Sequence, residues 1–215
     1  MKLLILGATG LVGRHVLQAA LNDPRIGLVL APTRRPLPAH AKLTNPVAPE
    51  LEVALANMPR QPVDAMVCAL GTTMAKAGSR EAFRHADYVL PLGFARRAYE
   101  EGAQAISLVS SPGASFSVPF FYSRTKAELE RDIAAVGFPS VTIVRPGMIG
   151  GAREEFRLAE RLVLPVARLL QPILSKGLWI NPAVTIAQVL LEAVIARDKG
   201  VRLLTSRNIV DAVAR

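Results

Sequence analysis

Tyr122 and Lys126, four residues apart, form the most informative chemical pair in the sequence. In a helix this spacing places both side chains on one face, where they can contact the same ligand. A phenol ordinarily has a pKa of about 10, and a neighbouring ammonium group favours the phenolate. Ser110 and Ser111, which follow an apolar run, can offer a hydroxyl to a substrate oxygen. These residue types indicate proton transfer at a substrate oxygen. The alternative is that the pair has no function and only reflects an ordinary helix with an aromatic residue near its start.

Three glycines near the start of the chain, Gly7, Gly10 and Gly13, predict a binding site for a dinucleotide, a plain glycine turn being the alternative. They follow an apolar strand expected at residues 3–6 and precede a helix expected from residue 11 onward. The first glycine permits a tight turn, the second lets the backbone approach a pyrophosphate, and the third allows the helix to pack closely on the strand. The helix N-terminus then supplies N–H groups to the anion. The residues expected to hold the coenzyme here are Gly7, Thr9, Gly10, Leu11 and Val12.

Arg34 and Arg35 follow a second expected strand, residues 27–30, where an acidic residue would contact the ribose hydroxyls of NAD. A guanidinium group suits a 2′-phosphate better than a neutral hydroxyl, because its planar fork of donors matches phosphate oxygens. The pair therefore predicts NADP(H) as the coenzyme, and the alternative is two solvated loop charges. A third apolar run, residues 65–70, ends at the carboxyl edge of the expected sheet, beside the coenzyme. The coenzyme contacts expected there are Leu70, Gly71, Thr72 and Thr73.

The composition describes one domain with a basic surface. The 215 residues fit a single domain with a sizeable core, and the formal net charge is +9 at pH 7. Because the arginines are scattered among glutamates and not interleaved with aromatic residues, nucleic-acid binding is not expected. The one cysteine, Cys68, is expected to be a buried packing residue, and the three histidines have no spaced partners that would predict a metal site. Since a strand is expected directly after Met1, no removable leader is expected and a cytoplasmic location is predicted.

Strand-like and helix-like segments alternate along the chain, which is typical of a parallel sheet with helices on both faces. We expect an α/β fold with a doubly wound parallel sheet of six or seven strands. We also expect residues 1–215 to form one NAD(P)-binding domain. The remaining strands are expected near residue 42 and at residues 106–109, 141–144 and 201–204. Helices are expected at residues 50–57, 83–101, 123–135 and 185–196, with Pro91 kinking or dividing the second of them.

Residues 148–184 are expected to form a small substrate-binding or lid portion inserted into this domain. Within it, residues 154–174 carry arginines on a polar side and contain two prolines. This amphipathic pattern suits a substrate lid, the surface of a homodimer, or a helix in peripheral contact with a membrane. The sequence leaves a monomer and a homodimer as open alternatives.

Together these motifs resemble the short-chain dehydrogenase/reductase superfamily, and within it the atypical NAD(P)-binding branch that includes the Tat-interacting-protein-like oxidoreductases. The resemblance implies that Ser111 is the catalytic serine, that Tyr122 is the acid/base, and that Lys126 supports Tyr122 and holds the nicotinamide ribose. It also implies that Pro146 and Gly147, in Arg145-Pro146-Gly147, contact the nicotinamide carboxamide. The other segments that carry it are the glycine motif, residues 71–73 and 76–79, Asp87-Tyr88-Val89-Leu90 and residues 108–111. Asp87 departs from the pattern, because many relatives carry there an asparagine that orders a water in a proton relay.

The predicted function is NADPH-dependent reduction of a small-molecule carbonyl substrate of unknown identity. Ser111, Tyr122 and Lys126 are the expected catalytic residues, and Ser110, Tyr122 and Lys126 are also expected to contact the coenzyme. Members of the resembled branch are often described as regulators or assembly factors. The alternative is therefore an NADPH-binding regulatory or assembly protein with little or no turnover.

Overall fold

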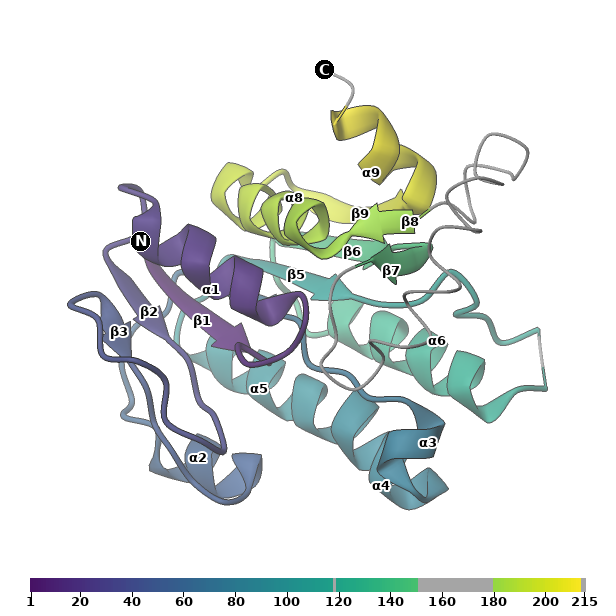
Figure 1. The fold of residues 1–215 in the computed structure, drawn as a ribbon, viewed down its shortest axis with the longest axis horizontal. Helices are drawn as coiled ribbons and strands as arrows, with labels where there is room; N and C mark the ends of the chain where they lie inside the picture. Colours follow the sequence, from purple (N-terminus) through teal and green to yellow (C-terminus); the bar gives the residue numbers. More distant parts are fainter. Residues whose placement is uncertain (118, 151–179, 214–215) are drawn as a thin grey trace.

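A seven-stranded parallel sheet forms the centre of the computed structural model, which describes residues 1–117, 119–150 and 180–213 (Figure 1). Its strands are β1 (Lys2–Leu6), β2 (Leu28–Leu30), β3 (Leu43–Thr44), β4 (Ala65–Cys68), β5 (Ala105–Val109), β6 (Ser140–Arg145) and β9 (Gly200–Thr205). They lie in the order β3-β2-β1-β4-β5-β6-β9, and each neighbouring pair is parallel. The predicted α/β fold with a doubly wound parallel sheet is confirmed.

Helices cover both faces of this sheet (Figure 1). One face carries α1 (Gly13–Asn22) and α8 (Ala183–Ala196), and the other carries α2 (Leu51–Asn57), α5 (Leu90–Glu100) and α6 (Phe121–Ala134). Shorter helices, α3 (Met74–Ala77) and α4 (Arg80–Arg84), follow β4, and α9 (Ser206–Val213) follows β9. A separate two-stranded sheet pairs β7 (Met148–Gly150) with β8 (Ile180–Pro182).

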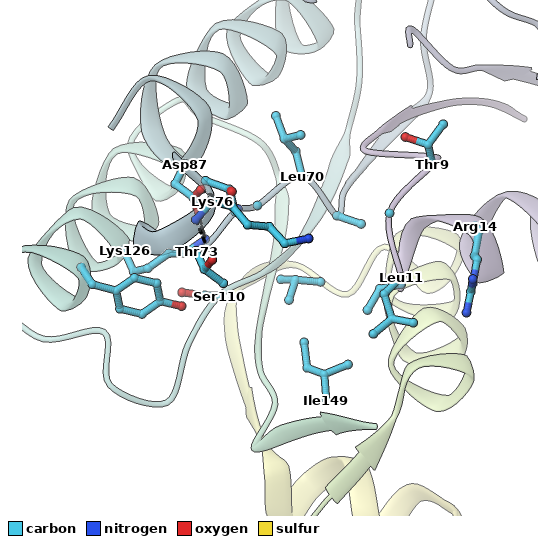
Figure 2. A pocket seen from close by; sticks show the side chains of 17 residues that line it. Thr9, Leu11, Arg14, Leu70, Thr73, Lys76, Asp87, Ser110, Lys126 and Ile149 are labelled. Carbon is cyan, nitrogen blue, oxygen red and sulfur yellow. Dashed lines mark hydrogen bonds and ion pairs between the residues drawn. The ribbon is translucent and has the colours of Figure 1, made fainter. Parts of the chain in front are cut away.

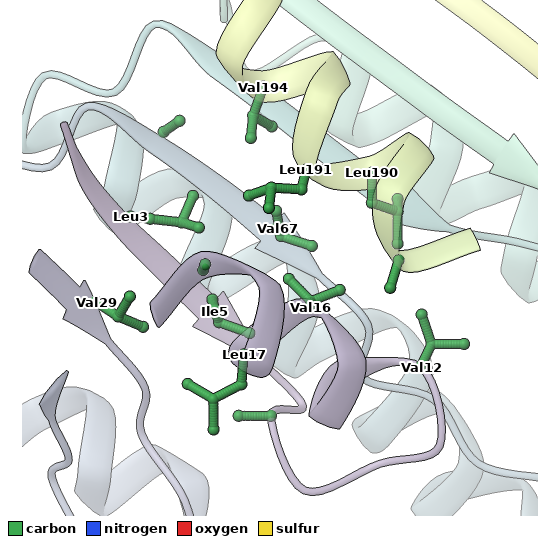
Figure 3. Close-up of a cluster of buried hydrophobic side chains, with 14 of the residues drawn as sticks. Leu3, Ile5, Val12, Val16, Leu17, Val29, Val67, Leu190, Leu191 and Val194 are labelled. Atoms are coloured by element: carbon green, nitrogen blue, oxygen red, sulfur yellow. The ribbon is translucent and has the colours of Figure 1, made fainter. Parts of the chain in front are cut away.

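Alternate side chains of β1 enter the two hydrophobic layers, as expected for a strand buried on both faces. Leu3 and Ile5 pack on the α1 and α8 side, whereas Leu4 and Leu6 pack on the α5 and α6 side, and all four are fully buried. Each such burial contributes roughly 1.5–3 kcal/mol relative to an exposed side chain. Figure 3 shows the first layer, in which Leu3 and Ile5 of β1 belong to one cluster of buried side chains with Val16, Leu17, Leu190, Leu191 and Val194.

The segment predicted as one helix at residues 83–101 is helical but divided. A π-helical turn, His85–Val89, lies between α4 and α5. Pro91 falls in the first turn of α5, directly after the π-helical turn, so it lies at the boundary between the two. The π-helical turn, the short helix α3, the C-terminal helix α9 and the β7–β8 pair were not anticipated from the sequence.

The expected lid portion, residues 148–184, is described only at its two ends, which form β7 and β8. The amphipathic segment at residues 154–174 lies outside the described residues. Among the helices that the structure describes, none combines the length and the apolar character needed to span a bilayer.

Candidate functional site

A cavity of about 440 Å³ lies at the carboxyl ends of β1, β4 and β5 (Figure 2). The strand order reverses beside it, because β2 flanks β1 on one side and β4 flanks it on the other. In doubly wound sheets ligands bind at this reversal. The lining residues are Thr9, Gly10, Leu11, Val12, Arg14, Ala69, Leu70, Gly71, Thr72, Thr73, Lys76, Asp87, Val109, Ser110, Tyr122, Lys126 and Ile149.

The glycine turn after β1 leaves no room for side chains at two of its three positions. Gly7 has a φ of 87°, and a Cβ there would lie 2.5 Å from the backbone nitrogen of Leu70. A Cβ on Gly13 would lie 1.9 Å from the carbonyl oxygen of Gly7. Gly10 is less crowded, with 3.2 Å from a built Cβ to that oxygen, and it faces the cavity. Gly7 and Gly13 thus serve packing, while Gly10 keeps the cavity wall free of a side chain.

The N-terminus of α1 opens into the same cavity. Its N-cap is Val12, which provides no side-chain hydrogen bond, and Val12 itself lines the cavity. The first N–H groups of a helix have no partner within the helix, and the helix dipole places positive potential there. Arg14 and Lys76 add cationic side chains to the lining. These features fit the pyrophosphate of a dinucleotide coenzyme.

Tyr122 and Lys126 both reach the cavity from α6, as their spacing predicts. The ring of Tyr122 packs against Phe83, with 5.3 Å between ring centroids. Ser110 comes from the end of β5, is 7% exposed, and its Oγ is buried without a hydrogen-bond partner in the described structure. A buried hydroxyl without a partner is costly, so this oxygen indicates a group that a bound ligand would contact.

Of the two adjacent serines, Ser110 lines the cavity and Ser111 does not. The Oγ of Ser111 accepts a long hydrogen bond of 3.4 Å from the N–H of Gly113. Successive residues leaving a strand point to opposite sides, so only one of the two can face Tyr122. The structure therefore brings Ser110, Tyr122 and Lys126 together.

A buried ion pair, which the sequence did not predict, joins Lys126 to Asp87. The Nζ of Lys126 lies 2.6 Å from Oδ1 of Asp87, and the side chains are 5% and 0% exposed (Figure 2). Oδ2 of Asp87 accepts a hydrogen bond of 2.7 Å from the N–H of Thr72. The only advance signal was the departure from asparagine at position 87.

Cys68, at the end of β4, lies close to this ion pair but takes no part in the cavity lining. Burial raises the pKa of its thiol to about 11, although the nearby Lys126 opposes the shift. A thiol that stays protonated at neutral pH is a poor nucleophile. Cys68 is thus a buried packing residue, as expected.

Five residues expected at the coenzyme do not line the cavity: Gly7, Arg34, Arg35, Pro146 and Gly147. Arg34 and Arg35 are exposed in the loop after β2, a loop shaped by a 2.6 Å hydrogen bond from the Thr33 hydroxyl to the carbonyl oxygen of Arg35. Pro146 and Gly147 lie between β6 and β7. The described residues contain no group of three or more His, Cys, Asp or Glu side chains that could hold a metal ion.

Asn181, in β8, makes buried contacts near the candidate site that sequence reasoning missed. It is fully buried, and its Oδ1 accepts a 2.7 Å hydrogen bond from the N–H of Gly147. Its Nδ2 donates a long hydrogen bond of 3.4 Å to the carbonyl oxygen of Ser206. This amide therefore ties the Pro146-Gly147 segment to β8 and α9, and no local pattern in the sequence marks it.

The sheet order, the glycine turn and the cavity at the strand ends define a Rossmann fold, and solved structures with this fold superpose on the chain. A short chain dehydrogenase family protein from Francisella tularensis superposes with a TM-score of 0.68 and 14% identity, over 97% of this chain and 98% of its own. An oxidoreductase of the short chain dehydrogenase/reductase family from Burkholderia thailandensis gives 0.70 and 20%, over 99% and 95%. MoeE5, solved in complex with UDP-glucose and NAD, gives 0.70 and 18%, over 100% and 81%.

The chain belongs to the family of FMP52 proteins. It is 36% identical to "Protein FMP52, mitochondrial" of Candida albicans over 207 residues, which cover 93% of this chain and 85% of the relative. The corresponding Aspergillus clavatus protein is 35% identical over 206 residues, or 91% and 88%. A scan against protein-family models finds no match.

The names of these relatives correct one prediction. Both are named mitochondrial, which contradicts the cytoplasmic location expected from the sequence. That expectation relied on β1 starting directly after Met1, and the position of a strand does not determine a compartment.

Proposed function

We propose that this protein is an NAD(P)-dependent oxidoreductase that reduces a small-molecule carbonyl compound, with NADP(H) as the preferred coenzyme. The observation that carries the proposal is the meeting of three groups in one cavity: the orphaned Oγ of Ser110, the phenol of Tyr122 and the ammonium of Lys126. The glycine turn and the start of α1 form the wall of the same cavity. A hydroxyl, a phenol and an ammonium beside a dinucleotide site suit reduction of a carbonyl group.

In this proposal the coenzyme, when bound, supplies a hydride to the carbonyl carbon. Gly10 and the N-terminus of α1 bind its pyrophosphate. Tyr122 donates a proton to the carbonyl oxygen, and the Ser110 hydroxyl donates a hydrogen bond to the same oxygen. Lys126, which lines the cavity from the same helix, holds the nicotinamide ribose. Ser110 takes here the role that the family resemblance gave to Ser111, since Ser110 lines the cavity.

The preference for NADP(H) rests on Arg34 and Arg35, which follow β2. They stand where a coenzyme site for NAD would have a carboxylate for the ribose hydroxyls. Both side chains are exposed and in reach of solvent anions. Likewise, the closer resemblance to Tat-interacting-protein-like oxidoreductases stays a prediction, supported by Asp87-Tyr88-Val89-Leu90 and residues 76–79.

The test compares wild type with Tyr122→Phe for binding of NADPH and for its oxidation in the presence of a panel of aldehydes, ketones and quinones. We expect Tyr122→Phe to bind NADPH within about twofold of wild type and to lose at least about a hundredfold in turnover, a typical share of general acid catalysis. Two results together would replace the proposed reaction with the regulatory alternative. Wild type would bind NADPH while no carbonyl compound in the panel supports its oxidation, and Tyr122→Phe would retain biological activity.

A further inference from the structure

One carboxylate, Asp87, lies between two hydrogen-bond donors that come from different parts of the cavity. The N–H of Thr72, in the loop after β4, donates to Oδ2 at 2.7 Å. The ammonium of Lys126, from α6, lies 2.6 Å from Oδ1. Asp87 is fully buried, and it is the one carboxylate among the described residues that line the cavity. It therefore connects the loop at the coenzyme side with the lysine of the proposed chemistry.

Both donors are satisfied only if the side chain at position 87 has a hydrogen-bond acceptor facing each of them. A carboxylate accepts at both oxygens, whereas an asparagine has one carbonyl oxygen and one NH2 group. With asparagine at position 87, the NH2 group would face either the N–H of Thr72 or the ammonium of Lys126, donor against donor. The chain's departure from asparagine at this position thus has a physical reason in its own contacts.

The backbone around Asp87 is arranged to present it there. Asp87 is the middle residue of the π-helical turn His85–Val89. Such turns are rare in proteins, and those that occur often lie at functional sites. The next residue, Tyr88, anchors the turn to α6 through a 2.7 Å hydrogen bond from its hydroxyl to Asp132. A Cβ built on Gly71 would lie 3.4 Å from Oδ1 of Asp87, so the loop backbone covers the ion pair closely.

From these contacts we propose that Asp87 is a positioning residue, which fixes Lys126 against the loop at Gly71 and Thr72 before the nicotinamide half of the coenzyme binds. The inference rests on the proposed function, because it assigns Lys126 to the nicotinamide ribose. Without Asp87 the ammonium of Lys126 is free to take other rotamers, and ordering it then costs binding free energy. The adenine half of the coenzyme, bound at the glycine turn, does not depend on Asp87.

The experiment measures the affinities of NADPH and of 2′,5′-ADP, which is the adenine half alone, for wild type and Asp87→Asn. We expect Asp87→Asn to weaken NADPH at least about tenfold and to leave 2′,5′-ADP within about twofold. General damage to the fold would weaken both ligands. Glu130→Gln is the matched control, because Glu130 forms another largely buried ion pair on α6, with Arg145, and does not line the cavity. It should leave the ratio of the two affinities unchanged.

Equal weakening of both ligands, or an unchanged NADPH affinity in Asp87→Asn, refutes the role of Asp87 and leaves the proposed function standing. Failure of wild type to bind NADPH refutes the proposed function, and this inference with it. If Asp87→Asn does not fold, amide hydrogen exchange of wild type decides. The proposal requires a protected Thr72 N–H without coenzyme, and exchange at the rate of an open loop overturns it.

Discussion

Gly10→Ala separates coenzyme binding from folding more cleanly than the other changes in the glycine turn. A methyl group at this position lies 3.2 Å from the carbonyl oxygen of Gly7 and 3.9 Å from that of Ala69. A shift of a few tenths of an ångström relieves the first contact, so we expect a stability loss of about 1 kcal/mol or less. For a chain of this length that corresponds to a melting temperature lower by about 2–4 °C.

The effect on binding should be much larger, because the added methyl stands where the pyrophosphate must approach the backbone. Losing one charge-assisted hydrogen bond costs about 1.5–3 kcal/mol, or roughly 10- to 150-fold in the dissociation constant. The assay is calorimetric titration of NADPH, with a thermal melt on the same sample. Gly10→Ala should therefore remain folded and lose at least tenfold in affinity.

Two further alanine variants serve as references. In Gly13→Ala the methyl lies 1.9 Å from the Gly7 carbonyl oxygen, a backbone atom, so α1 must move and the melting temperature should fall well beyond that of Gly10→Ala. In Gly27→Ala the nearest atom is 3.9 Å away and outside the cavity, so both measurements should stay at wild-type values. A folded Gly10→Ala that binds NADPH like wild type refutes the assignment of this turn to the pyrophosphate.

Three other changes have expected outcomes. Replacing Arg34 and Arg35 by serine should weaken NADPH at least about tenfold more than NADH in fluorescence titrations, and equal losses contradict the NADP(H) preference. Cys68 has a pKa raised by burial to about 11 from an ordinary 9.0, so its contribution to stability is complete below pH 9.0 and is lost as the pH rises through about 11. Urea unfolding should show up to about 3 kcal/mol of this pH dependence in wild type and none of it in Cys68→Ala; identical pH profiles argue against the burial effect. Asn181→Ala removes the buried acceptor of the Gly147 N–H and should cost about 1–3 kcal/mol in the same assay, whereas an unchanged midpoint contradicts that role.

The sequence predicted the main sheet well because its strands are short, nearly continuous apolar runs. β1, β4 and β6 are buried on both faces, and this burial leaves a strong pattern that local reading detects. The glycine turn was equally readable, since the positive φ of Gly7 and the contact of Gly13 with the Gly7 carbonyl oxygen both arise within the turn itself. The short pair β7–β8 was not readable, because its strands are separated by many residues and neither has a pattern of its own.

The site was predicted in its residue types but not in its contacts. The choice between Ser110 and Ser111 depends on which of them points toward the α6 side of the sheet. Because both follow the end of β5, the alternation of the strand in the sequence does not determine this. The ion pair between Asp87 and Lys126 was missed because Asp87 lies in a π-helical turn, which no propensity rule anticipates. The hold of Asn181 on the Pro146-Gly147 segment joins residues distant in sequence, and only the folded chain brings them together.

Calorimetric titration of the folded wild-type protein with NADPH and with NADH tests the central claim most directly. Saturable binding of at least one coenzyme, tighter for NADPH and weakened by Gly10→Ala, is the result that this account predicts. Absence of binding for both coenzymes at concentrations of about 1 mM would contradict it, because even a dissociation constant of that size represents only about 4 kcal/mol of binding free energy.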